Sequence, residues 1–270
     1  MKVLVEREGP VAVVTISRPE ARNAVDPETA SLLRAAFAEA ERDESVLATV
    51  LTGAGGHFCA GFDLKFAARS APVDMSNAAA KAKPGPMGPS RLLADREGAD
   101  PGHTLSKPLI AAVEGYAVAG GLELALLADI RVASATAVFG VYCRRWGVPL
   151  IDGGTLRLPR VVGQGRAMDM ILTGRGVNAE EALQWGLANR LTVEGHALRE
   201  AIELAQQIAR FPQLCMRADR ASAYAGWSQD IADALLSEAR RGEPVLSAES
   251  IAGAARFSSG KGRGGNFNDI

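Results

Sequence analysis

The first hydrophobic positions of the chain form two runs rich in β-branched residues, Lys2–Arg7 and Val11–Ser17, which are separated by Glu-Gly-Pro. Such runs around a short turn predict a β-hairpin. The spacing then becomes helical. Pro27 follows Asp26, and apolar residues recur along one face as far as Ala40, which predicts a helix with Asp26 as its N-cap.

The same order of strand, small-residue loop and helix then occurs twice. A strand at Val46–Leu51 runs into the glycine-rich TGAGGHFCAGFDL, and a strand at Pro108–Val113 runs into a glycine loop and a helix that contains Glu123. Another short strand is expected near Ile130–Ala133. The segment 67–105 has no such pattern and is rich in Pro, Gly, Ala and Ser, which is typical of a lid, a binding loop or disorder. The repeated order predicts an α/β fold.

The C-terminal part of the pattern is mainly helical. Asn178 with Glu181 three residues later resembles a capping box, and that helix should end near Gly186. Further helices are predicted at Ala197–Arg210, Pro212–Tyr224 and Asp230–Arg240, and the glycine-rich tail should be frayed. We therefore expect a mixed α/β core at 1–195 and a helical C-terminal region at 196–270.

Composition narrows the classes of function. A chain of 270 residues with 47% hydrophobic content can bury a large core, and 30 Lys and Arg against 31 Asp and Glu give no excess of positive charge for nucleic acid or an anionic membrane. The charges of Glu6, Arg7 and Glu8 interrupt any signal peptide, and the charged residues within 113–130 argue against a membrane span. These features predict a cytoplasmic protein.

The cysteines and histidines do not predict a metal or a disulfide. Cys59, Cys143 and Cys215 are scattered, and no histidine stands at metal-ligand spacing from a cysteine or carboxylate. The chain also lacks the GxxxxGK[ST] and GxGxxG patterns that bind phosphates and dinucleotides. We expect no metal and no bound cofactor.

The two glycine-rich turns hold the candidate chemistry. A helix N-terminus presents unpartnered N–H groups, so the turns around Ala60-Gly61 and Gly120-Gly121 are candidate sites for a negatively charged oxygen. Alternatively, the glycines only turn the chain. Glu123 shares a helical face with Leu126 and Leu127 and should be partly buried, either as a proton-transfer group or as a cap for its own helix.

The spaced motifs around these turns resemble those of the enoyl-CoA hydratase/isomerase superfamily, also called the crotonase family. The resemblance rests on RPEARNAV (18–25), HFCAGFDL (57–64), VEGYAVAGGLELALLADI (113–130), FGVYCRRWGVPLIDGGTLRLPRVVG (139–163) and LTGRGVNAEEALQWGLANRL (172–191). It implies a crotonase-like spiral of β-β-α units and a helical C-terminal region used in trimerisation. It also implies an acyl-CoA thioester substrate and a homotrimer or a homohexamer.

The resemblance implies roles for individual residues. The backbone N–H groups of Ala60 and Gly120 would form an oxyanion hole for the thioester carbonyl, and Glu123 would be the acid/base. Contacts with the substrate are expected from Arg22, Ala24, Gly61, Phe62, Asp63, Gly121 and Cys143, although Arg22 is alternatively a solvated side chain. The apolar residues of the irregular segment, Phe66, Met75, Met87, Leu92 and Leu93, either shape chain-length preference or pack a lid.

The sequence departs from the hydratase pattern where a second glutamate is expected. Cys143 stands there, and a thiol is a poor substitute for a carboxylate, so a structural role for Cys143 is an alternative. Asp152 resembles a proton-transfer aspartate of dienoyl-CoA isomerases, or else caps the Gly-Gly turn that follows. Ala119 replaces the first glycine of a three-glycine run. We expect hydration of a 2-enoyl-CoA, with double-bond isomerisation by Glu123 and Asp152, or binding without catalysis, as alternatives.

Overall fold

The computed structural model describes residues 1–69, 87 and 105–265. Its larger sheet has the strand order β1-β2-β3-β4-β6-β9. Its strands are β1 (Val3–Glu8), β2 (Val11–Ile16), β3 (Ala48–Gly53), β4 (Leu109–Val113), β6 (Ile130–Ser134) and β9 (Arg190–Thr192). β1 and β2 form the predicted antiparallel hairpin, and every later pair of neighbours is parallel. The larger sheet is therefore mainly parallel, and the segments that connect its parallel strands must cross over one face of the sheet.

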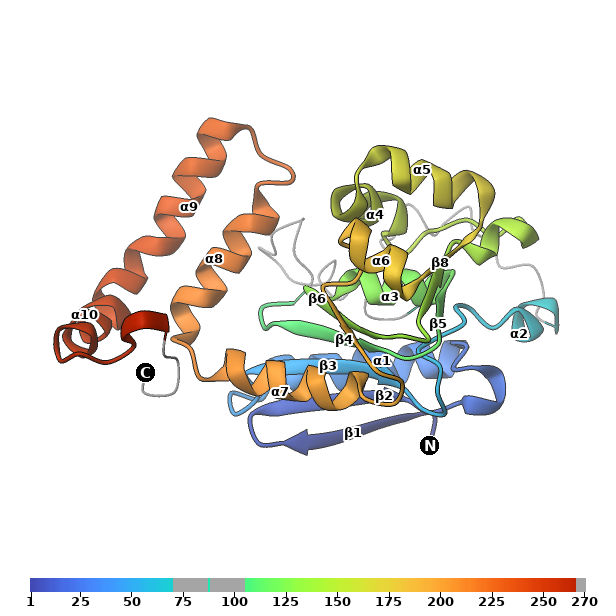
Figure 1. The fold of residues 1–270 in the computed structure, drawn as a ribbon, viewed down its shortest axis with the longest axis horizontal. Coiled ribbons are helices and arrows are strands. Elements are labelled where there is room, and N and C mark those ends of the chain that lie inside the picture. Colours follow the sequence, from blue (N-terminus) through green and yellow to red (C-terminus); the bar gives the residue numbers. More distant parts are fainter. Residues whose placement is uncertain (70–86, 88–104, 266–270) are drawn as a thin grey trace.

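The parallel strands are buried on both faces. Val11, Val13 and Val50 pack with one group of buried residues, whereas Val14 and Leu51 pack with another. Helix α7 (Ala197–Ala209) covers the first face and α1 (Pro27–Arg42) covers the second (Figure 1). This alternation explains why the strands read as nearly continuous apolar runs. The packing of the core continues through α7, past the boundary that we predicted near residue 195.

A second sheet lies beside the first and supports the candidate site. It is built from β5 (Tyr116–Val118), β7 (Val138–Gly140) and β8 (Gly176–Asn178), with β7 in the centre. β5 leads directly into α3 (Gly120–Leu127), which lies between the two sheets and carries Glu123 (Figure 1).

The remaining helices cover this second sheet or extend from the body. They are α2 (Leu64–Arg69), α4 (Gly154–Val162), α5 (Gln164–Thr173), α6 (Ala179–Trp185), α8 (Gln213–Ala225), α9 (Ile231–Val245) and α10 (Ile251–Ser258). Short 3-10 helices occur at Pro19–Ala21, Tyr142–Trp146 and Arg263–Gly265, and a π-helical turn at Leu246–Ser250 joins α9 to α10. α8 and α9 form an antiparallel hairpin beside the sheets (Figure 1).

The predicted N-caps at Asp26 and Asn178 are confirmed, whereas the Glu181 carboxylate accepts from Arg175. Asp26 accepts a hydrogen bond from the N–H of Thr29, and Asn178 accepts one from the N–H of Glu181. The short strands β5, β7, β8 and β9 and the helices α4, α5 and α10 were not predicted, because none is long enough to show a clear period. Within the described parts of the chain, no helix combines the length and the apolar character needed to cross a bilayer. Met75, Leu92 and Leu93 lie outside the described residues.

Candidate active site

Glu123 lies in one of the most apolar helices of the molecule. Every residue of α3 is buried, and Glu123 itself is only 3% exposed. The helix begins after Ala119, whose φ of 54° lies in the region that favours glycine. Burial of this kind makes the charged form of a carboxyl costly, so Glu123 needs partners.

Two backbone N–H groups supply those partners. The N–H groups of Asp152 and Gly154 both donate to Glu123 Oε1, at 2.8 Å each. Burial raises the pKa of Glu123 to about 7, opposed by the Gly154 N–H and assisted by the negative charge of Asp152. A carboxyl that titrates near neutral pH can accept and return a proton in one catalytic cycle. Glu123 therefore does not cap its own helix.

Asp152 is directed into the protein and not towards solvent. It is 2% exposed, and its Oδ1 accepts a hydrogen bond from the N–H of Met87 at 3.3 Å. The Asp152 N–H donates to Glu123 Oε1, and the negative charge of the Asp152 carboxylate raises the pKa of Glu123. The geometry is thus compatible with Asp152 as a member of the site.

The two glycine-rich turns pack against each other. Gly61 has a φ of 96°, and a Cβ atom there would lie 2.9 Å from the N atom of Gly120 and 2.8 Å from the Cβ atom of Ala119. A Cβ atom on Gly120 would lie 2.4 Å from Met87 Sδ, so the buried Met87 side chain covers that glycine. Gly121 is equally confined, because a Cβ there would lie 2.0 Å from the carbonyl oxygen of Cys59. Only small residues allow this approach.

The donors of the first turn differ from the prediction. The Ala60 N–H donates to the carbonyl of Arg22 at 3.0 Å, so it is not directed at a ligand, and the expectation for Ala60 is not supported. The N–H of Gly61 donates to Cys59 Sγ and that of Asp63 to the carbonyl of Val25. Within positions 60–63, only the Phe62 N–H has no acceptor among the described residues. The N–H of Gly120, at the start of α3, also has no acceptor among them.

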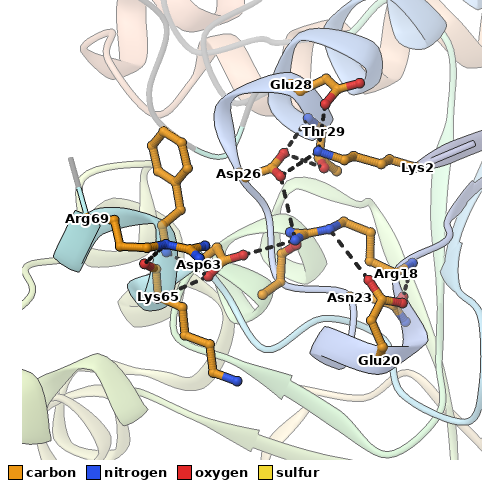
Figure 2. Close-up of polar contacts among 12 residues, drawn as sticks. Lys2, Arg18, Glu20, Asn23, Asp26, Glu28, Thr29, Asp63, Lys65 and Arg69 are labelled. Carbon is orange, nitrogen blue, oxygen red and sulfur yellow. Dashed lines mark hydrogen bonds and ion pairs between the residues drawn. The ribbon is translucent and has the colours of Figure 1, made fainter.

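A charged network holds the first turn in place. Arg18 Nη2 donates to Asp63 Oδ2 at 3.0 Å and lies 3.5 Å from Asp26 Oδ2, while Arg18 Nη1 donates to the carbonyl of Ala24 (Figure 2). Asp63 Oδ1 accepts from the N–H groups of Lys65 and Phe66 at the start of α2. Both oxygens of Asp63 are thus engaged within the chain, which favours a structural role over the predicted substrate contact.

Asn23 fixes the same turn from its other side. The side chain is completely buried, and its Nδ2 donates to the carbonyls of Ala54 and His57 at 2.8 and 2.6 Å. Its Oδ1 accepts from the N–H of Arg18. The segment 18–25, in which Arg22 and Ala24 are predicted to contact the substrate, therefore supports the turn at 57–63.

Two predicted contacts with the substrate lie near this support. Arg22 is exposed, and its guanidinium lies over the Tyr116 ring, with 5.6 Å between Cζ and the ring centroid. Ala24 is 9% exposed, and its carbonyl accepts a hydrogen bond from Arg18 Nη1. The exposed guanidinium of Arg22 thus remains available for contact with a ligand. The carbonyl of Ala24 already accepts a hydrogen bond from Arg18.

Cys143 lies beside Glu123 in the 3-10 helix Tyr142–Trp146. It is 6% exposed, and burial together with the charge of Glu123 raises the pKa of its thiol. A protonated thiol cannot act as a base at neutral pH. The structure therefore favours the structural alternative for Cys143.

Sequence reasoning missed three groups at the site: the Phe62 N–H, Gly154 and Arg18. Their contacts join segments far apart in the chain, so local patterns carry no signal for them beyond the small residues themselves. No group of three or more His, Cys, Asp or Glu side chains suited to a metal ion occurs in the part of the chain that is described.

The site combines two backbone N–H groups that have no acceptor in the described part of the chain, those of Phe62 and Gly120, with a buried carboxyl whose pKa is about 7. This combination is typical of enzymes that stabilise an oxyanion while a proton is moved next to a carbonyl. The family model of enoyl-CoA hydratase/isomerase matches residues 6–257, and the chain belongs to that family. It is accordingly an enzyme with the crotonase fold, related to lyases that are named hydratases.

Relatives and solved structures agree with this assignment. The chain is 41% identical over 215 residues to the enoyl-CoA hydratase EchA19 of Mycobacterium tuberculosis, covering 80% of this chain and 77% of the relative. It is 37% identical over 213 residues to the carnitinyl-CoA dehydratase of Salmonella typhi, covering 78% and 76%. The crystal structure of enoyl-CoA hydratase EchA1 from Mycobacterium marinum superposes with a TM-score of 0.83 at 33% identity, covering 96% of each chain.

Proposed function

We propose that this enzyme adds water to the double bond of a 2-enoyl-CoA thioester, with Glu123 as the acid/base. The observation that supports this most directly is the burial of Glu123 with a pKa of about 7, beside two backbone donors that have no acceptor among the described residues. Two related proteins are named enoyl-CoA hydratase and carnitinyl-CoA dehydratase, and both names denote the addition or removal of water.

In the proposed reaction, the N–H groups of Gly120 and Phe62 donate to the thioester oxygen. Water attacks C3 of the substrate as the Glu123 carboxylate accepts one of its protons, and the C2–C3 π electrons move onto the thioester as an enolate. Protonated Glu123 then returns the proton to C2, which restores the carboxylate and the thioester carbonyl. One carboxyl thus serves both steps, so Cys143 has no part in the proton transfer.

The test follows the ultraviolet absorbance of crotonyl-CoA with the wild-type protein and with Glu123→Gln. We expect the absorbance of the conjugated thioester to fall with the wild type, and the rate to drop at least about 1000-fold in the variant, because general acid–base catalysis supplies about this much. Tight binding of crotonyl-CoA without any loss of absorbance would contradict hydration and favour binding without catalysis.

Isomerisation is a second candidate because Asp152 is buried at the same site. A 3-enoyl-CoA would lose a C2 proton to one carboxyl and gain a proton at C4 from the other, which moves the double bond into conjugation. A gain in absorbance with 3-enoyl-CoA that is abolished in both Glu123→Gln and Asp152→Asn would support this reaction. Isomerisation would be contradicted if the protein hydrates crotonyl-CoA and only Glu123→Gln, not Asp152→Asn, abolishes that activity.

We also propose that the enzyme assembles into a homotrimer or homohexamer through its C-terminal helices. Large apolar side chains are exposed on α9 and α10, including Ile231 at 81%, Ile251 at 72% and Phe257 at 63%. A monomer would leave these side chains in water. Sedimentation should show an oligomer that Ile231→Lys weakens, whereas Leu172→Lys on α5, which is 72% exposed, should leave the oligomer unchanged.

A further inference from the structure

Arg157 lies directly over the turn that holds Glu123. It stands on α4, and its Nη1 donates to the carbonyl of Asp152 at 3.0 Å. Gly153 has a φ of 96°, and a Cβ atom there would lie 2.1 Å from Arg157 Nη1. The guanidinium therefore occupies the space that any larger residue at 153 would need, and it contacts the backbone of the turn from outside.

The inner side of the same turn faces Glu123. The N–H groups of Asp152 and Gly154 both donate to Glu123 Oε1, so that carboxyl is held by the two peptide groups that flank the peptide between Asp152 and Gly153. A hydrogen bond to the Asp152 carbonyl limits rotation of the peptide group between Asp152 and Gly153. Arg157 is thus linked to Glu123 through one turn of three residues.

The charged and titratable groups around Glu123 come from three elements. Asp152 belongs to the turn itself and raises the pKa of Glu123, Arg157 on α4 lowers it, and the Cys143 thiol lies nearby in its 3-10 helix. Arg157 in turn interacts electrostatically with Tyr224 on α8, whose hydroxyl donates to Asp129 Oδ1 at 2.8 Å.

We propose that Arg157 is a positioning residue of the active site, which fixes the turn at 152–154 so that both N–H groups hold Glu123 in its reactive orientation. This role rests on the proposed acid/base function of Glu123 and adds a residue to it. Arg157 touches the support of the carboxyl and has no direct contact with the substrate in this role.

The experiment compares Arg157→Gln and Arg157→Met with the control Arg160→Gln. Arg160 lies one turn later on α4, where it is exposed, donates to the carbonyl of Leu156 and stacks on Trp227. We expect both Arg157 variants to lower kcat for crotonyl-CoA by about 10- to 100-fold with little change in KM, because misplacement of a reacting group has effects of this size.

The pH profile separates positioning from a purely structural role. Loss of the cation and of the oriented N–H groups disfavours the carboxylate, so the pKa of Glu123 should rise. The limb of the kcat profile that reports Glu123 then shifts to higher pH in both Arg157 variants, whichever protonation state is active. Arg160→Gln should keep the wild-type kcat and profile. A fall in kcat with an unmoved limb would overturn the proposal.

An infrared titration tests Arg157 without turnover. The stretch of the protonated Glu123 carboxyl, assigned by its absence in Glu123→Gln, should disappear at higher pH in Arg157→Gln than in the wild type. This measurement separates the two proposals, because it remains decisive even if crotonyl-CoA is not hydrated. Coincident titrations would overturn the role of Arg157, and so would failure of both Arg157 variants to fold, since Arg157 would then serve the stability of α4.

Discussion

The two turns that meet at the site are built in opposite ways. The turn at 57–63 is held by charged and polar side chains, chiefly Arg18 and Asn23, which reach it from a distant segment. The turn at Ala119–Glu123 has apolar walls and is confined by close packing. The first turn is fixed by polar contacts and presents a backbone donor. The second turn supplies a backbone donor and Glu123, the carboxyl that we propose as the acid/base.

The two carboxyls beside these turns show what the difference means. Asp63 and Glu123 are 8% and 3% exposed, yet their pKa values move in opposite directions. Burial acts to raise the pKa of both, but hydrogen bonds from the backbone and from Arg18 leave the pKa of Asp63 below its ordinary value. Glu123 has neutral N–H partners and a nearby anion, Asp152, so burial prevails although Arg157 acts in the opposite direction. The partners thus decide in which direction the pKa of a buried carboxyl moves.

The largest effect on stability is expected from Arg18→Met, which removes the cation of the first turn. Asp63 and Asp26, with side chains 11% and 10% exposed, would lose a shared charged partner. We expect the free energy of unfolding to fall by about 3 kcal/mol, because a buried charge left unpaired costs this much or more. Urea unfolding at a fixed protein concentration measures the change.

The control for this variant is Arg7→Met, which breaks the exposed pair between Arg7 and Asp43. An exposed pair contributes less than about 1 kcal/mol. Equal losses in the two variants would show that the network around Arg18 is not special, and would remove the contrast between the two turns.

For Glu123→Gln we expect the opposite sign, an increase in stability at alkaline pH. The pKa of this carboxyl is raised from 4.5 to about 7 in the folded state, so folding takes up a proton between these values and stability falls as pH rises through them. The neutral variant avoids this loss, which corresponds to about 3 kcal/mol above pH 7.

Thermal unfolding of Glu123→Gln and the wild type at pH 8 and at pH 4 checks this expectation. The gain in stability should be present at pH 8 and absent at pH 4, where Glu123 is protonated in both states. An equal change at both pH values would mean that the variant acts through packing and not through charge.

Gly154→Ala should reduce kcat by about 100-fold, because displacement of a reacting group by a fraction of an ångström to one ångström has effects of this order. A Cβ atom there would lie 2.9 Å from both Cγ and Oε1 of Glu123, so the carboxyl must move. The matched control is Gly165→Ala on α5, where a Cβ atom would meet nothing within 4 Å. Steady-state kinetics with crotonyl-CoA distinguish the two, and similar rates in both variants would contradict a tight fit around Glu123.

The smallest effect is expected from Cys143→Ala. Because burial and Glu123 keep the thiol protonated, its removal should change kcat by less than about threefold. A loss of 100-fold, measured in the same assay, would instead assign the thiol a part in proton transfer and would extend the chemistry beyond Glu123.

Several local features were predictable because neighbouring residues create them. The hairpin of β1 and β2, the caps at Asp26 and Asn178 and the helical start of Glu123 follow from periods and end signals within about ten residues. The family resemblance extended these elements to a fold, which the match over residues 6–257 confirms. The contact of the Ala60 N–H with the carbonyl of Arg22, which counts against the predicted role of Ala60, could not be foreseen because spacing alone does not reveal it.

The sequence by itself determined which residues are the candidates for chemistry: small residues where two turns must meet, and one glutamate within an apolar helix. Only the tertiary structure decided what that glutamate is, because its pKa depends on burial and on N–H groups about thirty residues away in the chain, at Asp152 and Gly154. Electrostatic energies depend on distance in space and on the exclusion of water, and a pattern along the chain contains neither.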